Sequence, residues 1–194
     1  ETEELREKTG QELELVFVDD GSRDSTLDLL RTAAKEDSHI RYISFSRNFG
    51  KESAMYAGLA ASRGDLVIVM DADLQHPPAM IPDMIKGIEE GYDCCAASRS
   101  TRKGEAPVRS FFSRMFYHLS NRMTNVKMAY GAVDFRIMTR QMVDAILKLS
   151  EVERFSKGIF AWVWFETKWY PYENVERTVG TSKWSFWGLF RYAL

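Results

Sequence analysis

Asp71, Asp73 and Gln75 are spaced two apart and directly follow an apolar run at 65–70. In an extended segment alternate residues share a face, so these three side chains can present oxygen ligands to one hard cation, Mg²⁺ or Mn²⁺. A cation held there would bridge a diphosphate and neutralise charge that develops on its leaving group. The alternative is an acidic surface turn in front of a proline-initiated helix. The pattern therefore predicts a divalent-metal site, with this alternative still open.

A second acidic pair, Asp19 and Asp20, follows the apolar run at 13–18. Ligands bind at the carboxyl ends of strands in open α/β sheets, so this pair is expected at the same edge as the first. Carboxylates there accept hydrogen bonds from a nucleobase N–H or a ribose hydroxyl group, which predicts nucleotide binding. The alternative is a helix N-terminus, whose dipole favours acidic side chains. His76 is interpreted as part of a turn, without a catalytic role.

A basic cluster lies between positions 99 and 127 and contains a single acid, Glu105. After Pro107, apolar residues recur on one helical face and arginines lie on the other. The basic residues of the cluster are Arg99, Arg102, Lys103, Arg109, Arg114, Arg122 and Lys127. Such a helix can bind phosphate groups, although a solvated polar face is the alternative.

Short apolar runs alternate with helical patterns, which favours an α/β layer fold with a largely parallel sheet. The chain has 194 residues, 45% of them hydrophobic, and is interpreted as one domain over 1–194. Strands are expected at 13–18, 40–45, 65–70 and 94–97. Helices are expected at 4–9, from Asp24 or Ser25, at 50–61, after Pro77 and Pro78, and after Pro107.

Charge, cysteines and hydropathy narrow the class of protein. A formal net charge of -2 gives no global field for nucleic acid, so no nucleic-acid partner is expected. Cys94 and Cys95 are the only cysteines, and adjacent cysteines rarely meet the geometry of a structural disulfide, which indicates a reducing compartment. No apolar run approaches the roughly 18 residues of a membrane span. No Gly-x-Gly-x-x-Gly follows a strand, which disfavours a dinucleotide-dependent oxidoreductase.

The C-terminal segment at 183–192 mixes aromatic and basic residues. This mixture is typical of a membrane interface, so 180–194 is predicted to be an interfacial amphipathic segment. An ordinary amphipathic core helix is the alternative.

Four motifs, in this order along the chain, resemble the inverting family 2 glycosyltransferases, and among them the polyprenyl-phosphate glycosyltransferases. They are Val18-Asp19-Asp20-Gly21-Ser22, Ser46-Arg47-Asn48-Phe49-Gly50-Lys51, Asp71-Ala72-Asp73-Leu74-Gln75-His76-Pro77-Pro78 and Asp134-Phe135-Arg136. The resemblance implies a GT-A, Rossmann-like fold with a mostly parallel central sheet flanked by helices. It also implies metal-dependent transfer of a hexose from a nucleoside-diphosphate sugar to a polyprenyl phosphate, with inversion. Glucose and UDP are the expected sugar and nucleotide.

The resemblance also assigns roles to the residues that match its motifs. Asp73 and Asp134 are the catalytic candidates, and Asp134 matches an acid near the acceptor that is often called the base. The metal ligands are Asp71, Asp73 and Gln75. The nucleotide-sugar ligands are Asp19, Asp20, Asp71 and Arg99. The residues near the acceptor phosphate are Arg109, Ser113 and Lys183.

Phosphate chemistry qualifies the role of Asp134. The second pKa of a phosphate monoester is about 6, so the acceptor is largely ionised without help, and Asp134 is expected to position it rather than deprotonate it. A purely structural acid, paired with Arg136 or a neighbouring arginine, is the alternative.

The chain departs from the family pattern at its start. The family begins with a strand that holds the nucleotide, and this chain has no match to it, so an absent central strand with two open strand edges is expected. Membrane helices are expected beyond Leu194, with the full-length protein anchored at the cytoplasmic face of a membrane. Two alternatives stay open: a saccharide or protein acceptor, and a non-catalytic nucleotide-binding or membrane-docking module.

Overall fold

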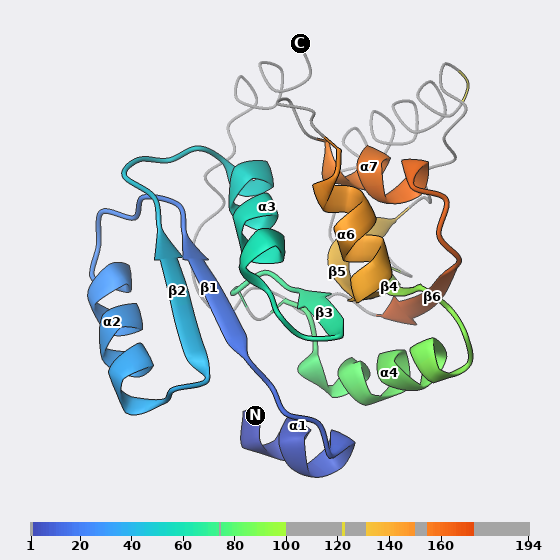
Figure 1. The fold of residues 1–194 in the computed structure, drawn as a ribbon, viewed down its shortest axis with the longest axis horizontal. Coiled ribbons are helices and arrows are strands. Elements are labelled where there is room, and N and C mark those ends of the chain that lie inside the picture. The colour runs from blue at the N-terminus through green and yellow to red at the C-terminus, as the bar shows by residue number, and fades with distance from the viewer. Residues whose placement is uncertain (1, 74, 100–121, 123–130, 150–154, 173–194) are drawn as a thin grey trace.

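Helices flank two β-sheets in the computed structural model, which describes residues 2–73, 75–99, 122, 131–149 and 155–172 (Figure 1). After α1 (Thr2–Thr9), the first sheet pairs β1 (Leu15–Asp19) with β2 (Ile40–Ser44) in parallel. Along the chain, α2 (Thr26–Glu36) comes between these two strands. The Asp24 carboxylate accepts a hydrogen bond from the Thr26 N–H at 3.1 Å. The expected helix start near Asp24 or Ser25 is confirmed.

The second sheet has four strands in the order β3-β5-β4-β6. These are β3 (Leu66–Val69), β5 (Ala132–Thr139), β4 (Cys94–Arg99) and β6 (Thr167–Tyr172). Strand β5 runs antiparallel to both β3 and β4, whereas β4 and β6 are parallel.

Helices cover both faces of the four-stranded sheet. Successive side chains of β4 point to opposite faces, so two neighbouring residues show what packs on each side. Cys94 packs with α3 (Lys51–Ala61), α6 (Arg140–Leu147) and α7 (Ser156–Trp162). Cys95 packs on the other side with α4 (Ile81–Glu89), which follows the 3-10 turn η1 (Pro78–Met80). Both thiols are free and buried, and burial raises the pKa of Cys95 to about 11. The resulting layers confirm the α/β class.

The strand arrangement differs from the expected mostly parallel central sheet. The described strands form two sheets, and β5 runs antiparallel to both of its described neighbours. Two strands, β5 and β6, lie outside the expected set. Among the strands that the structure describes, β1 and β3 each have one hydrogen-bonded neighbour, so each keeps one open edge.

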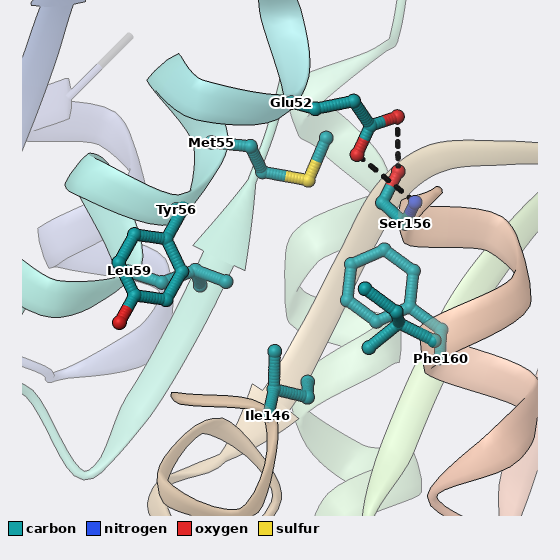
Figure 2. Close-up of a pocket in the computed structure, with 8 residues that line it drawn as sticks. Glu52, Met55, Tyr56, Leu59, Ile146, Ser156 and Phe160 are labelled. Carbon is teal, nitrogen blue, oxygen red and sulfur yellow. Dashed lines mark hydrogen bonds between the residues drawn. The ribbon is translucent and has the colours of Figure 1, made fainter. Parts of the chain in front are cut away.

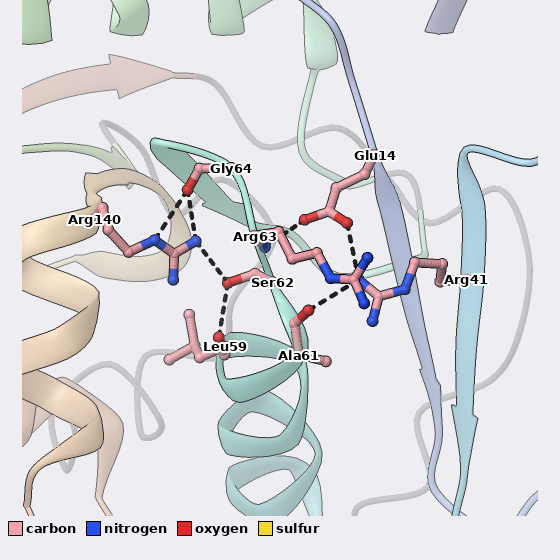
Figure 3. A network of polar contacts seen from close by, with 8 residues as sticks. All are labelled: Glu14, Arg41, Leu59, Ala61, Ser62, Arg63, Gly64 and Arg140. Atoms are coloured by element: carbon pink, nitrogen blue, oxygen red, sulfur yellow. Dashed lines mark hydrogen bonds and ion pairs between the residues drawn. The ribbon is translucent and has the colours of Figure 1, made fainter.

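Helix α3 links the two sheets through a polar network at its C-terminal end (Figure 3). From the first sheet, Arg41 donates at 3.0 Å both to the Ala61 carbonyl oxygen and to the Glu14 carboxylate. From the start of α6, Arg140 donates to the Gly64 carbonyl oxygen at 2.6 and 3.0 Å. Positive side chains at helix C-terminal carbonyl groups are favoured by the helix dipole. This network therefore fixes α3 between the sheets.

Candidate active site

The antiparallel pairing of β3 and β5 brings two acidic residues together. Val69 lies opposite Arg136, and continuing that register by two residues places Asp71 opposite Asp134. The two carboxylates share one cation, the Lys51 ammonium. Its Nζ lies 2.8 Å from each carboxylate oxygen of Asp71 and 2.7 Å from Asp134 Oδ2.

Lys51 is the first residue of α3. Its ion pairs with the two acids are partly exposed to solvent. The side chains of Lys51, Asp71 and Asp134 are 50%, 35% and 13% exposed, so Asp71 is open to a ligand and Asp134 is mostly covered. Partial burial acts to lower the pKa of Lys51, but the charges of Asp134 and Asp71 outweigh it and hold that pKa above its ordinary value. The ammonium is thus firmly protonated at neutral pH.

The residues expected to bind a divalent cation supply a chemically suitable donor set. Asp71, Asp73 and Gln75 offer only oxygen ligands, the kind that Mg²⁺ and Mn²⁺ prefer. Asp71 already binds a positive group, and Asp73 Oδ1 accepts a hydrogen bond from the Gln75 N–H at 3.2 Å. Within the described ranges, no three His, Cys, Asp or Glu side chains are grouped to hold a metal ion. A metal ion at this site would therefore be bound by the carboxylates of Asp71 and Asp73 and by the side-chain amide of Gln75. Metal binding stays a prediction.

His76 is buried, and Arg99 is partly buried at the end of β4. His76 is 3% exposed and stacks on Phe135, with ring centroids 5.3 Å apart. Burial lowers the pKa of His76, although the carboxylates of Asp71 and Asp73 oppose that shift. In the part of the chain that the structure describes, His76 Nδ1 and Arg99 Nε are buried without a hydrogen-bond partner. His76 is thus a neutral core residue beside the acids, and nucleotide-sugar binding by Arg99 stays a prediction.

Asp19 lies at the end of β1 with internal partners for both carboxylate oxygens. Oδ1 accepts a hydrogen bond from the Ser22 N–H at 3.0 Å, and Oδ2 accepts one from Ser44 Oγ at 3.1 Å. Hydrogen bonding to Ser22 and Ser44 outweighs burial and holds the pKa of Asp19 below its usual range. The residue is 4% exposed, and these hydrogen bonds stabilise the end of the strand. Nucleotide binding by Asp19 stays a prediction.

Asp20 fixes the loop that leads into α3. Its two carboxylate oxygens accept hydrogen bonds from the backbone N–H groups of Phe49, at 2.7 Å, and Gly50, at 2.9 Å. Gly21 makes this approach possible, because a Cβ at that residue would lie 2.4 Å from the Arg47 carbonyl carbon. Asp20 therefore stabilises a helix N-terminus, as the alternative interpretation expects, but that of α3 rather than α2.

Glu52, next to Lys51, connects α3 to α7 (Figure 2). Its carboxylate accepts hydrogen bonds from the Ser156 N–H at 2.9 Å and from Ser156 Oγ at 3.0 Å. An acid at the N-terminus of α7 is favoured by the helix dipole. Apolar side chains from α3, α6 and α7 line a small cavity beside this contact: Met55, Leu59, Ile146 and Phe160.

Several expected site residues lie outside the described ranges. They are Arg109, Ser113, Lys183 and the segment 180–194. The described helices include none long and apolar enough to cross a membrane.

Sequence reasoning missed Lys51 as a site residue, although it belongs to a quoted motif. A signal was present, because a lysine in the first turn of a helix opposes the helix dipole. The structural alternative paired Asp134 with Arg136 or a neighbouring arginine, and in the described part of the chain Lys51 forms an ion pair with it. Arg136 instead donates to backbone carbonyl oxygens of Val133 and Asp134 and lies 3.7 Å from the centre of the Phe160 ring.

Comparisons with known proteins show the family of this chain. The model of "Glycosyl transferase family 2" matches residues 2–147. The chain is 52% identical over 181 residues to the glycosyltransferase CsbB of Bacillus subtilis (strain 168), covering 93% of this chain and 55% of that protein. It is 39% identical over 191 residues to the bactoprenol glucosyl transferase of Shigella phage SfV, covering 98% of this chain and 62% of that protein. The chain thus spans little more than half the length of these relatives.

A solved structure is similar to this chain in its fold. The mannosyltransferase PcManGT from Pyrobaculum calidifontis, solved with GDP-Man and Mn²⁺, superposes with a TM-score of 0.54 at 17% identity. The match covers 82% of this chain and 46% of that one.

Proposed function

Because this chain belongs to glycosyl transferase family 2, we propose that it transfers glucose, or a related hexose, from a UDP-sugar to a polyprenyl phosphate. Its GT-A-like fold is confirmed by the similarity to nucleotide-sugar transferases. The observation that carries the proposal is the convergence of Asp71 and Asp134 on one cation. With a divalent cation bound beside them, these acids would suit a donor whose departing group is a diphosphate.

The proposed reaction forms one bond and breaks another at the anomeric carbon of the hexose. A phosphate oxygen of the acceptor attacks that carbon, and the bond to the nucleoside diphosphate breaks with inversion. The acceptor phosphate is largely ionised near neutral pH, since its second pKa is about 6. Asp134 then orients the acceptor, and the Lys51 ammonium keeps the Asp134 carboxylate in place.

The donor side of the site uses the strand ends. Asp71, Asp73 and Gln75 would hold Mg²⁺ or Mn²⁺, which would neutralise charge on the departing diphosphate. The Nε–H of Arg99 would donate to a phosphate oxygen. Asp19 and Asp20 would border the nucleotide, and their hydrogen bonds to Ser22, Ser44 and the 49–50 backbone would fix the shape of that pocket.

The acceptor side follows from the resemblance and from the relatives. A relative at 39% identity is named a bactoprenol glucosyl transferase, which supports a polyprenyl phosphate acceptor. Arg109, Ser113 and Lys183 would contact the lipid phosphate. A lipid acceptor requires a membrane surface, so we place the reaction at its cytoplasmic face, with 180–194 at the interface and the full-length protein anchored there.

Calorimetry tests the donor assignment. UDP, GDP and their hexose conjugates are titrated into the chain with and without Mn²⁺. We expect Mn²⁺-dependent binding of the UDP series, lost in Asp71→Asn and kept in Asp83→Asn, whose carboxylate is exposed on α4. No nucleotide binding by the folded chain would overturn the proposal in favour of a docking module.

The acceptor needs its own experiment, because a saccharide or protein acceptor would use the same donor site. We expect Arg109→Ala to lose transfer to polyprenyl phosphate while donor binding persists. Normal transfer by that variant would show that Arg109 does not bind the acceptor phosphate, and absence of transfer to polyprenyl phosphate by the wild type would show that the acceptor is of another class.

A further inference from the structure

Lys51 covers the same oxygens that a divalent cation would need. Its Nζ lies 2.8 Å from both Oδ1 and Oδ2 of Asp71. Mg²⁺ binds carboxylate oxygens at about 2.0–2.1 Å, so an ammonium in this position excludes a metal ion from Asp71 by overlap and by repulsion between like charges.

The geometry also allows the ammonium to leave Asp71 without becoming unpaired. Lys51 Nζ has a second carboxylate partner, Asp134 Oδ2, at 2.7 Å. Asp134 is the more covered acid, at 13% exposure, whereas Asp71 is 35% exposed. A lysine side chain is a flexible stem with three donors, so a shift toward Asp134 requires little more than rotation of side-chain bonds.

We propose that Lys51 is a built-in counter-cation that neutralises Asp71 in the metal-free protein and competes with the divalent cation for it. This inference rests on the proposed function, because it takes Asp71 as a metal ligand. Lys51 is a positioning residue in this account: it prevents repulsion between Asp71 and Asp134 before the donor binds, and it stays on Asp134 afterwards. Metal affinity without nucleotide is therefore held low, and the metal enters mainly with its diphosphate.

Binding of Mn²⁺ alone, measured by electron paramagnetic resonance on the full chain, tests the competition. We expect Lys51→Met to bind Mn²⁺ about tenfold more tightly than the wild type, a size typical of coupling between two ligands. Lys51→Arg keeps a cation that can contact both oxygens of a carboxylate and is expected to bind Mn²⁺ no more tightly than the wild type. A residue with only a structural role would give the opposite result, since its loss would weaken the site.

Three controls separate the possible failures. Lys35→Met removes the same charge from an exposed position on α2 and should leave Mn²⁺ affinity unchanged. Asp71→Asn should abolish the gain in a Lys51→Met background, and circular dichroism checks that each variant folds. Unchanged or weaker Mn²⁺ binding by folded Lys51→Met overturns the competition, even if UDP still binds with Mn²⁺ and the proposed function stands. Absence of Mn²⁺ binding in every variant, with or without UDP, overturns both.

Discussion

The C-terminal end of α3 places cations where the helix favours them. Arg41 donates to the Ala61 carbonyl oxygen, and Arg140 donates to the Gly64 carbonyl oxygen just beyond the helix. The partial negative charge at a helix C-terminus stabilises such contacts. Glu14 neutralises Arg41, so this end combines a satisfied helix terminus with an ion pair.

The N-terminal end of the same helix is stabilised by Asp20, but its first turn also carries an unfavourable charge. Lys51 carries a positive charge in the first turn, where the helix dipole is unfavourable to it. Asp71 and Asp134 offset that cost, and each of them is also expected to meet a substrate or a metal. The contrast teaches that one end of α3 is arranged for stability, whereas the other end keeps charges that a ligand can rearrange.

The largest expected effect is a loss of catalysis on mutation at the N-terminal end of α3. It would sharpen the contrast between the two ends of this helix. We expect Asp134→Asn to lower transfer of labelled hexose to polyprenyl phosphate by about 10²-fold, because the side chain that orients the acceptor phosphate is altered. Urea unfolding should show little change, since Lys51 keeps its contact with Asp71.

The matched control lies on α6, near the other end of α3. Asp144 is 53% exposed and lies 3.9 Å from Arg140, and exposed pairs of this kind contribute little. Asp144→Asn should transfer hexose at the wild-type rate. Equal losses in the two variants would contradict a special role for the N-terminal end.

A smaller effect, on stability alone, is expected at the C-terminal end. Arg140→Met removes the hydrogen bonds to the Gly64 carbonyl oxygen and to Ser62 Oγ, and hydrogen bonds from charged groups contribute about 1.5–3 kcal/mol. The free energy of unfolding in urea should fall by about 2 kcal/mol. Nucleotide affinity should not change.

Arg31→Met is the control for that stability effect. Arg31 is 54% exposed and pairs with Asp28 at 3.2 Å on α2, so its loss should cost less than about 0.5 kcal/mol. Arg140→Met could also reduce the free energy of nucleotide binding by as much as it reduces the free energy of unfolding. In that case the two ends of α3 would not act independently.

The sequence predicted the parts of the molecule that depend on local pattern. The runs at 13–18, 40–45 and 65–70 form β1, β2 and β3 to within two residues at each end, because apolar runs bounded by polar residues have few other structures. Asp19 ends β1 and Asp71 follows β3 as predicted, but the two strands belong to different sheets rather than to one. The α/β class was predictable for the same reason.

The missed features depend on contacts between distant segments. Strand β5 contains Asp134 and Arg136, which obscure its apolar pattern, and Arg136 is stabilised by backbone carbonyl oxygens and the Phe160 ring only after folding. The antiparallel insertion of β5 between β3 and β4 has no local signal. Lys51 could be flagged as a lysine at a helix start, but its pairing with both acids follows from the β3–β5 register.

The smallest expected effect is the pH dependence of the ion pair at the C-terminal end. Burial acts to raise the pKa of Glu14, but hydrogen bonds from the Arg63 N–H and from Arg41 outweigh it, so the pKa lies below its ordinary value of 4.5. A lowered pKa in the folded state means that the unfolded chain binds more protons, so this contribution is complete above the ordinary pKa and is lost as pH falls through the lower, folded value. The free energy of unfolding of Glu14→Gln should therefore be about 1 kcal/mol lower than that of the wild type near neutral pH, and urea titrations below pH 4.5 should show that difference shrinking.

The control is Glu36→Gln, at an exposed position on α2, which should show no such trend. A difference that stays constant with pH would mean that Glu14 acts through shape rather than charge, and the electrostatic contrast between the two ends of α3 would then depend on the arginines alone.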